Sequence, residues 1–369
     1  MTTCDVLIVG AGPAGSSCAR RLVQAGIDVV IADRAAFPRD KVCTGWITPE
    51  TIDALELDLT DYAAGRTLQP FTGFALSRWD DEPILCDFDR PVSYGIRRVE
   101  LDDYLLRRSG ARARLSYGIR TLRRDGSRWR ADDDLMATIV IGAGGHDCPV
   151  AREMNPDRGH ETIVAAQDAE FRAPDGSLDP PASRPSLVVW PDLLGYGWVV
   201  RKGEFLSVGA GRLHDSAWSA AMQDFHALLR RRRVAGVESA RFRGHAYLLN
   251  TTSRRRLAGD GLILAGDAAG LALAPSGEGI LAAAESGAMA AATAIAALQG
   301  DRSAFDAYAA AIVRRFGPRA TGRARPWPAW VGPAVSRLLF KSPKLARRLL
   351  LERSFLHQNR DRRSAALTA

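Results

Sequence analysis

Three glycines near the start of the sequence have the spacing of a dinucleotide-binding turn. They are Gly10, Gly12 and Gly15, and Pro13 and Ala14 lie between the last two. In such a turn the first glycine permits a tight bend, the second lets the backbone approach a pyrophosphate, and the third lets a helix pack closely on a strand. A helix that begins here offers its free N–H groups and positive dipole end to the pyrophosphate. The motif therefore predicts a dinucleotide site.

The segments around this turn are those that a βαβ unit requires. Residues 6–9 and 29–32 are short apolar runs, typical of parallel strands buried on both faces. Asp33 ends the second run, near the spacing at which an acid binds the adenosine ribose. Arg34 either lies over the adenine or is solvated. We therefore expect the adenosine end of the ligand at Asp33.

Two later segments supply the rest of a parallel sheet. Residues 137–142 and 262–265 are further apolar runs, and Gly266 and Asp267 follow the second of them. Asp267 either contacts the cofactor or caps the next helix. The sheet is thus expected to be assembled from three separated pieces of the chain.

An alanine-rich helix is predicted from about residue 280 to 298. Its start, at Pro275, Gly277, Gly279 and Ile280, carries two glycines. Such a terminus directs N–H groups and a positive dipole end at whatever lies above it. The alternative is an ordinary Gly/Pro loop.

The pattern of apolar and polar residues changes between residues 161 and 254. Alternating runs at 163–171, 186–190, 196–200 and 205–209 predict an antiparallel sheet, and 218–232 predicts a helix. Tyr196 and Trp198 are two residues apart on a predicted strand, so they face the same side of it. They either line a pocket for an apolar or aromatic substrate or belong to the core of the sheet.

Charge is distributed unevenly along the 369 residues. The formal net charge is +8, but residues 314–363 hold fourteen Lys/Arg and two acids, which leaves 36 bases and 40 acids elsewhere. The body is therefore mildly acidic, and no nucleic-acid partner is expected. The basic C-terminal region also carries Trp327, Trp330 and the apolar residues 338–340. It is either a solvated helical lid or a peripheral contact with an anionic membrane.

Five scattered cysteines form no C-x-x-C pair, and the first strand begins at residue 5, before which a targeting segment has no room. We therefore expect a cytoplasmic protein with no metal site. No stretch reaches the roughly 18 uncharged apolar residues that a membrane span needs. The six histidines fall in unrelated places, and no Ser-His-Asp set offers competing chemistry.

Several motifs, in order along the chain, resemble those of the FAD enzymes related to para-hydroxybenzoate hydroxylase. Within that superfamily the chain is most similar to the geranylgeranyl reductase branch. The motifs are Gly10-x-Gly12-x-x-Gly15, the Cys43 loop at 37–45, Arg98-x-x-Leu-Asp102, Tyr196-x-Trp198, Gly266-Asp267 and Pro275-x-Gly277-x-Gly279-Ile280.

This resemblance implies an α/β fold with a Rossmann-type FAD domain, an antiparallel substrate domain and a helical C-terminal extension. The FAD domain would comprise residues 1–70, 98–160 and 255–305. The substrate domain would comprise 71–97 and 161–254, and the extension 306–369.

The resemblance also implies roles for individual residues. Asp267 would bind the ribityl chain of a non-covalent FAD, and the helix starting at Ile280 the flavin edge. Arg98 either pairs with the phosphates of the cofactor through its donor fork or is a surface arginine at the start of a helix. Asp102 is interpreted as structural. Cys43 would lie beside the isoalloxazine, where it either shapes the substrate pocket or is simply a buried thiol. The candidate catalytic residues are Cys43, Tyr196 and Trp198. The candidate cofactor-binding residues are Gly10, Gly12, Pro13, Ala14, Gly15, Asp33, Arg34, Cys43, Arg98, Thr121, Gly266, Asp267, Pro275, Gly277, Gly279 and Ile280.

Three departures from the family pattern bear on the reaction. The motif F-P-K is replaced by Val200-Arg201-Lys202, and Cys-Gly-Gly by Cys43-Thr44-Gly45. Gly144-Gly145 stands where hydroxylases have an Asp-Gly pair that contacts cofactor and nicotinamide. The source of electrons, NAD(P)H or a separate reductase, stays open.

The sequence thus favours a reductase or dehydrogenase acting on a hydrophobic small molecule. A monooxygenase that hydroxylates an aromatic or polyketide-like compound is the main alternative. A halogenase ranks below both, because its W-x-W-x-I-P motif is absent from the sequence. The non-enzyme alternative is a membrane-surface flavoprotein that carries electrons.

Overall fold

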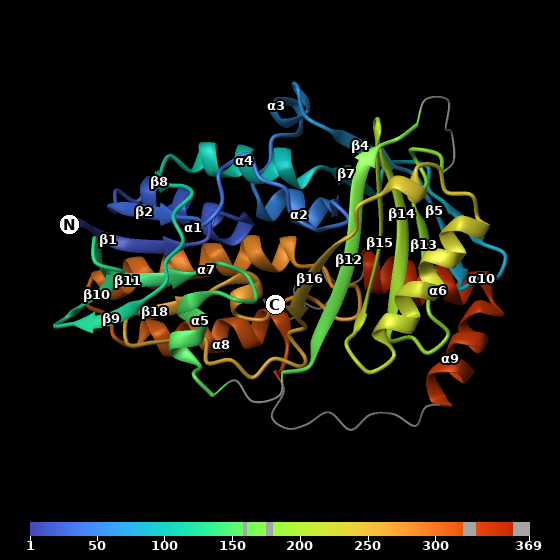
Figure 1. Cartoon of the computed structure of the whole chain (residues 1–369). Coiled ribbons are helices and arrows are strands. Elements are labelled where there is room, and N and C mark those ends of the chain that lie inside the picture. The colour runs from blue at the N-terminus through green and yellow to red at the C-terminus, as the bar shows by residue number, and fades with distance from the viewer. Residues whose placement is uncertain (158–160, 175–179, 320–329, 357–369) are drawn as a thin grey trace.

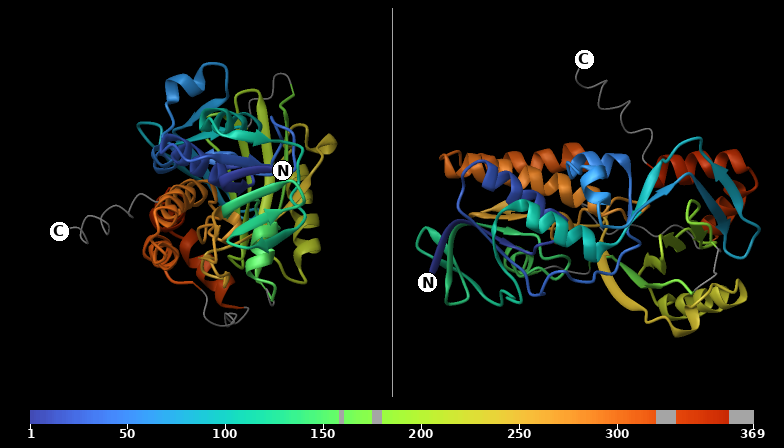
Figure 2. Two further views of the ribbon diagram at one scale, coloured as in Figure 1. Left: turned by 90° about the vertical axis from the view of Figure 1, so that its left-hand side faces the viewer. Right: turned by 90° about the horizontal axis from the view of Figure 1, so that it is seen from above.

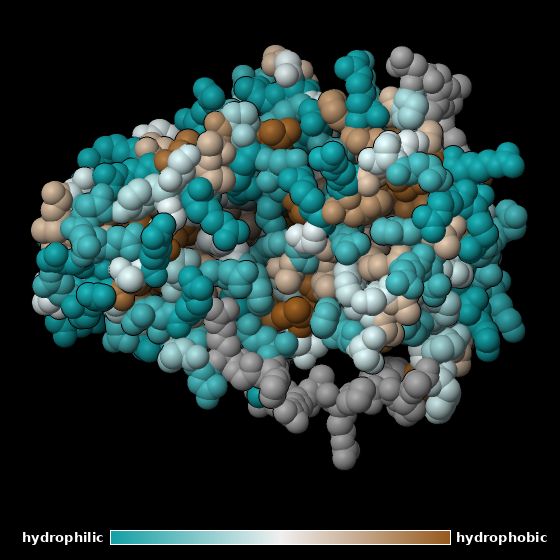
Figure 3. Space-filling view, in the orientation of Figure 1, coloured by the Kyte–Doolittle hydropathy of each residue, from teal (hydrophilic) through white to brown (hydrophobic). Residues whose placement is uncertain are grey.

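Two large sheets lie side by side in the computed structural model, and helices cover their outer faces (Figure 1). The structure describes residues 1–157, 161–174, 180–319 and 330–356. On the face shown in Figure 3 hydrophilic residues predominate, and hydrophobic residues form small separate patches. The predicted combination of a parallel sheet, a separate antiparallel sheet and C-terminal helices is confirmed.

The first sheet is built on parallel strands that come from distant parts of the chain. Its central strand, β1, pairs in parallel with β2 on one side and β11 on the other, and β11 pairs in parallel with β18. Val6, Leu7 and Ile8 of β1 are fully buried, as expected for a strand covered on both faces. The order is β17-β18-β11-β1-β2-β8, with β10 paired to β11 and β9 paired to β10. The bounds are β1 Thr2–Val9, β2 Val29–Ala32, β8 Arg112–Arg114, β9 Leu122–Asp125, β10 Arg128–Ala131, β11 Leu135–Gly142, β17 Ala258–Gly259 and β18 Leu262–Leu264.

Helices α1 and α7 pack closely against each other beside this sheet (Figures 1 and 2). Gly287 of α7 makes this approach possible, since a Cβ there would lie 2.3 Å from the carbonyl oxygen of Ala14. By length and composition α7 is long and apolar enough to cross a membrane, but more than half of it is buried within the fold. The helices of this half are α1 Pro13–Gln24, α4 Arg98–Ser109, α5 Pro149–Met154, α7 Ile280–Leu298 and α8 Ala304–Phe316, with the short 3₁₀ turn η2 Gly266–Ala268.

The second sheet has seven strands in the order β16-β12-β15-β14-β13-β5-β6. Its pairs are antiparallel, as predicted, except that β13 and β5 run parallel. Helix α6 covers one face (Figure 1). The bounds are β5 Gly73–Arg78, β6 Ile84–Asp87, β12 Ile163–Arg172, β13 Ser186–Val189, β14 Gly195–Lys202, β15 Phe205–Leu213, β16 Arg243–Leu248 and α6 Trp218–Arg231, with the 3₁₀ turn η1 Val237–Ser239.

A small third sheet joins the two halves and was not predicted. It consists of β3 Trp46–Ile47, β4 Leu68–Phe71 and β7 Ser93–Ile96, with β7 in the middle. Segment 71–97 is therefore divided between two sheets, because β5 and β6 belong to the seven-stranded one. Helices α2 Pro49–Ala54 and α3 Leu59–Ala63 lie in the chain between β3 and β4.

The C-terminal helices pack on the seven-stranded sheet. They are α9 Val331–Phe340, α10 Pro343–Leu345 and the π-helical η3 Ala346–Phe355, and they lie near β5 at the end far from the N-terminus (Figure 2). Ser336 of α9 is fully buried and donates to the carbonyl oxygen of Pro191 at 2.6 Å. Leu351 and Phe355 are buried in the core of the sheet. Trp327, singled out in the sequence, lies outside the described residues, as do residues 357–369.

Candidate active site

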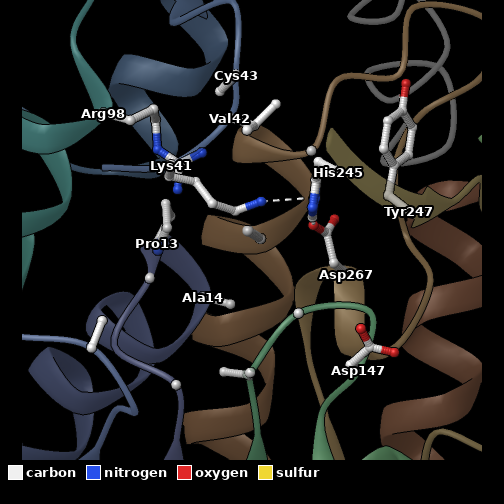
Figure 4. A pocket seen from close by; sticks show the side chains of 18 of the residues that line it. Pro13, Ala14, Lys41, Val42, Cys43, Arg98, Asp147, His245, Tyr247 and Asp267 are labelled. Carbon is white, nitrogen blue, oxygen red and sulfur yellow. Dashed lines mark hydrogen bonds and ion pairs between the residues drawn. The ribbon is translucent and has the colours of Figure 1, made fainter. Parts of the chain in front are cut away.

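A cavity of about 430 Å³ lies where the parallel sheet meets the seven-stranded sheet. Its walls come from the β1–α1 turn, the loop after β2, and the starts of α4 and α7. Strands β12, β14 and β16 of the second sheet close it. Figure 4 shows the contribution of β16, through His245 and Tyr247. One continuous space thus contacts both halves of the molecule.

The glycine-rich turn has the geometry that its spacing predicts. Gly10 has φ +110°, and a Cβ there would lie 2.3 Å from the carbonyl oxygen of Ala143. A Cβ at Gly15 would lie 1.9 Å from the carbonyl oxygen of Gly10. Gly12 faces the cavity, and among the described residues the only neighbour within 4 Å of its added Cβ is the flexible guanidinium of Arg39. The turn therefore forms a cradle in which a pyrophosphate can approach the backbone closely.

Asp33 lies at the cavity with its carboxylate already bonded to backbone. Its Oδ2 accepts from the N–H of Ala11 at 2.8 Å, and its Oδ1 accepts from the N–H of Ala35 at 2.9 Å. These bonds tie the glycine-rich turn to the end of β2. Arg34 is exposed at the edge of the same cavity. This position is compatible with both predicted alternatives, a contact with the adenine and a solvated side chain.

Two arginines share one buried carboxylate next to the turn. Arg98 donates to both oxygens of Asp102, at 2.7 and 2.8 Å, and Arg39 lies 3.0 Å from one of them. Asp102 is fully buried, which fits a structural role. The cluster carries one net positive charge beside Gly12, as suits a diphosphate. The sequence identified Arg98 but missed Arg39.

Lys41, His245 and Asp267 form a polar row across the cavity (Figure 4). Lys41 Nζ lies 2.8 Å from Nε2 of His245, and that nitrogen lies 3.5 Å from Oδ2 of Asp267. One imidazole nitrogen thus faces an ammonium and a carboxylate, so either His245 accepts from Lys41 or it carries the proton itself. The prediction that the histidines fall in unrelated places is wrong for His245, because β16 carries it into the cavity.

The electrostatics of this row follow from burial and charge. Burial lowers the pKa of Lys41 to about 8, although the carboxylate of Asp267 opposes the shift. Burial alone would raise the pKa of Asp267, but His245 and then Lys41 outweigh it and lower that pKa to about 2. The row therefore holds a stable carboxylate beside a lysine that gives up its proton easily.

The start of α7 reaches the cavity through Gly277, Gly279 and Ile280. Gly277 has φ +70°, and a Cβ there would lie 2.3 Å from the hydroxyl oxygen of Tyr247. Gly15, Gly266 and Pro275 support the walls without lining the cavity. Thr121 lies away from it on the surface, where its hydroxyl bonds to Asp132 at 3.0 Å.

The end of the cavity formed by the second sheet is aromatic. Tyr196 and Trp198 of β14 line it, together with Tyr247 of β16. Trp198 is also held within the sheet, since its Nε1 donates to buried Asp168 at 2.9 Å and to Ser207 at 3.3 Å. Both predicted alternatives, pocket wall and sheet core, therefore hold for Trp198.

The hydroxyl groups of this end stay protonated. Burial raises the pKa of Tyr196 and of Tyr247. The hydroxyl of Tyr196 donates to the carbonyl oxygen of Ser276, just before α7. His245 and Tyr247, at alternate positions of β16 like Tyr196 and Trp198 on β14, were missed because the sequence around them gives only a weak strand signal.

Cys43 lines the cavity in the loop between β2 and β3. Its side chain is half-buried, and its Sγ accepts from the N–H of Gly45 at 3.4 Å. The other four cysteines, Cys4, Cys18, Cys86 and Cys148, are free and buried. Within the described part of the chain no group of three or more His, Cys, Asp or Glu is placed to hold a metal ion.

These features fit FAD. The cradle and the Arg39–Arg98 pair would hold the pyrophosphate, Asp33 and Arg34 would contact the adenosine end, and Asp267 and the start of α7 would contact the remainder of the cofactor. FAD would supply the electron transfer, and the protein its binding and electrostatics. The fold and this site define an FAD-dependent oxidoreductase.

Comparison with known proteins agrees. Residues 3–59 match the family model described as an FAD binding domain. The chain is 30% identical over 310 residues to menaquinone reductase of Mycobacterium tuberculosis, covering 78% of this chain and 75% of that protein. It is 30% identical over 325 residues to geranylgeranyl diphosphate reductase of Rhodobacter capsulatus, covering 81% and 77%.

The fold has a counterpart among solved structures. A geranylgeranyl bacteriochlorophyll reductase-like protein from Thermoplasma acidophilum superposes with a TM-score of 0.71 at 21% identity, covering 86% of this chain and 85% of that one. The chain belongs to the geranylgeranyl reductase family of FAD-dependent oxidoreductases, as its motifs predicted.

Proposed function

We propose that the protein reduces or dehydrogenates a carbon–carbon bond of a hydrophobic small molecule. The observation that carries this proposal is the single cavity, which runs from the glycine-rich cradle to the aromatic side chains of Tyr196, Trp198 and Tyr247. Such pockets favour domain interfaces. The names of the two reductase relatives point to substrates with prenyl chains, and an aromatic wall suits such chains.

The polar row supports a reaction that also moves protons. Reduction of a carbon–carbon double bond requires a hydride, which is two electrons and one proton, and one further proton. Lys41, His245 and the hydroxyl of Tyr247 are proton-carrying groups that line the cavity, and burial lowers the pKa of Lys41 to about 8. The direct test is anaerobic turnover of a polyprenyl quinone or geranylgeranyl diphosphate by protein that carries chemically reduced FAD. Product analysis by mass spectrometry should show a gain of two hydrogens.

The main alternative is a monooxygenase, which the fold alone also permits. Only a monooxygenase consumes oxygen in step with product. Product formed without oxygen would exclude an obligatory oxygenation, whereas product that appears only with oxygen and gains one oxygen atom would overturn the proposed reduction. The same assays with NAD(P)H, with and without an added reductase, identify the electron source.

Cys43 is proposed to take part in the reaction from the loop beside the cofactor. The Cys43→Ser and Cys43→Ala proteins should bind FAD normally but turn over substrate more slowly. Unchanged turnover with intact FAD would remove the thiol from the mechanism. Tyr196→Phe and Trp198→Phe test the proposed aromatic wall in the same assay, where a rise in KM is expected.

We also propose the domain limits given by the sequence: residues 1–70, 98–160 and 255–305 for the cofactor half, 71–97 and 161–254 for the substrate half, and 306–369 for the extension. The small third sheet, formed by β3, β4 and β7, spans the limit between residues 70 and 71. Limited proteolysis should cut first at their boundaries if the halves are separable units.

A membrane contact is proposed for the surface of α9 and α10. Trp330 is 71% exposed and Leu338 is 66% exposed, and no acid occurs between residues 330 and 351. The exposed cations there are Arg337, Lys341, Lys344 and Arg348. Exposed apolar side chains among cations suit an anionic lipid surface, where each cation contributes about 1 kcal/mol.

Vesicle flotation tests this contact. The protein should float with phosphatidylserine-containing vesicles but not with phosphatidylcholine alone, and Trp330→Ser/Leu338→Ser should abolish flotation. Val313→Ser, at a 42% exposed position on α8, is the matched control. Flotation that is absent, or equal for both lipids, would reject the proposal.

A further inference from the structure

Lys202, at the end of β14, is a fully buried lysine next to the loop that carries Cys43. Its Nζ donates to the carbonyl oxygen of Thr44 at 2.9 Å and to the carboxylate of Glu170. Burying an ammonium is costly unless an opposite charge and hydrogen bonds compensate for the lost water. These two contacts provide both, and they join the seven-stranded sheet to the loop.

Two glycines leave the space that this side chain fills. A Cβ at Gly45 would lie 2.7 Å from Lys202 Nζ, and a Cβ at Gly95 would lie 2.8 Å from its Cγ. Gly45 also has φ +69°, and its Cβ would meet the carbonyl oxygen of Ile96 at 2.1 Å. The loop and β7 are therefore shaped around the lysine.

The partner of Lys202 is itself held by Arg97, which directly precedes α4. Glu170 of β12 accepts from Nε of Arg97 at 2.8 Å, and the guanidinium of Arg97 lies 3.5 Å from the ring centroid of Phe205. Arg97 directly precedes Arg98, the residue that pairs with Asp102 at the cradle. A continuous set of charged contacts thus leads from the sheet to the start of α4.

We propose that Lys202 is a positioning residue that holds the backbone of residues 43–45 against the seven-stranded sheet and so fixes the place of the Cys43 thiol at the cavity. Lys202 does not line the cavity, so it acts through the loop. This inference rests on the proposed function, in which the Cys43 loop lies beside the cofactor. It also gives a reason why, of the family's F-P-K, this chain keeps the lysine alone.

Cys43 is a built-in probe of the loop, because the other four cysteines are buried. Lys202→Met keeps the length of the side chain but removes the donor and the charge. Loss of a hydrogen bond from a charged group should shift local opening of the loop by about tenfold. We expect iodoacetamide to alkylate Cys43 about tenfold faster in the folded variant, measured by peptide mass spectrometry.

Arg212→Met is the matched control. Arg212 is a buried cation of the same sheet, on β15, and it pairs with Asp192 and Asp215 at 3.0 Å each without touching the Cys43 loop. The Arg212→Met variant should have a lower free energy of unfolding, measured by urea unfolding. The alkylation rate of its Cys43 should be unchanged. A general loosening of the sheet would instead raise that rate in both variants, which would overturn the proposal.

Glu170→Gln is a second variant that tests the proposal if Lys202→Met does not fold. It weakens the hold on the ammonium but keeps the bond to Thr44, so a smaller increase in Cys43 alkylation is expected. Unchanged alkylation in the folded variants would reject the positioning role. These assays need no substrate, so they decide on Lys202 even if Cys43→Ala turns over normally and the proposed role of the thiol fails.

Discussion

The two ends of the cavity are built differently. The cofactor end is lined largely by backbone and small residues, as at Gly10, Gly12 and Ala14, whereas the other end is lined by Tyr196, Trp198 and side chains of β16. Backbone can be brought close to a ligand only by glycine at fixed spacings, so that end leaves a local motif in the sequence. Side chains from several strands can build the other end in many ways, so that end leaves little local signal.

The largest effect is expected where Phe355 of the C-terminal extension packs against the aromatic end. Phe355 lies 4.8 Å from Tyr196 and 5.7 Å from Trp46, between ring centroids. Phe355→Ala should lower the free energy of unfolding by about 3–5 kcal/mol, since it removes a buried ring. Urea unfolding measures this loss. Leu338→Ala, at a 66% exposed position, should change the free energy by less than about 0.5 kcal/mol. Equal losses in the two variants would show that the extension is not part of this core.

The next largest effect concerns the backbone-lined end. Gly15→Ala places a methyl group 1.9 Å from the carbonyl oxygen of Gly10. Overpacking of this kind costs about 1–3 kcal/mol, so FAD should bind up to about a hundredfold more weakly. Fluorescence titration of the flavin measures the affinity. Gly244→Ala is the control, since its methyl would meet nothing closer than the carbonyl oxygen of Ala166 at 4.0 Å. Normal FAD affinity in Gly15→Ala would show that the cofactor end of the cavity does not depend on close backbone approach at its glycines.

A smaller effect is expected where the two ends meet, at Lys41. Its pKa is about 8 in the folded protein, against an ordinary value of 10.5. Between about pH 8 and pH 10.5 the unfolded chain therefore binds a proton that the folded chain does not, so stability rises with pH in this window. The rise is at most about 1.4 kcal/mol per pH unit.

Lys41→Met isolates that contribution. In cofactor-free protein, the difference in free energy of unfolding between wild type and variant should shift in favour of wild type as pH rises from about 8 to 10. Urea unfolding at several pH values gives the difference directly. A difference that does not vary with pH would mean that Lys41 titrates as a solvated lysine.

The smallest effect is expected at the exposed edge of the cofactor end. Arg34→Ala removes a guanidinium that can stack on an adenine, a contact worth about 0.5–1 kcal/mol at an exposed site. FAD affinity should fall by about two- to fivefold. No change at all would favour the alternative that Arg34 is simply solvated.

The contrast also explains what the sequence could predict. Strands β1, β2, β11 and β18 and helices α6 and α7 follow from apolar runs and periodicity that are local in the chain. The cradle follows from glycine spacing: Gly10 and Gly12 line the cavity, and Gly15 allows the close approach of α1 to the carbonyl oxygen of Gly10.

Features that depend on distant pairings could not be predicted. The parallel pairing of β13 with β5 joins segments about a hundred residues apart, and no local pattern specifies it. His245 reaches Lys41 across 204 positions of sequence. Phe355 follows a basic, helical stretch whose composition indicates solvent or membrane, and only the folded structure shows its ring between Trp46 and Tyr196.

The close packing of α1 on α7 has a consequence for synthesis of the protein. The cradle is encoded at the very start of the chain, but β18 and α7, which complete its sheet and the far wall of the cavity, end at Leu264 and Leu298. On the ribosome β11 therefore has no β18 beside it, and α1 has no α7 to pack on, until residues 262–298 have been synthesised. FAD can be captured in its full site only after Leu298 has been synthesised.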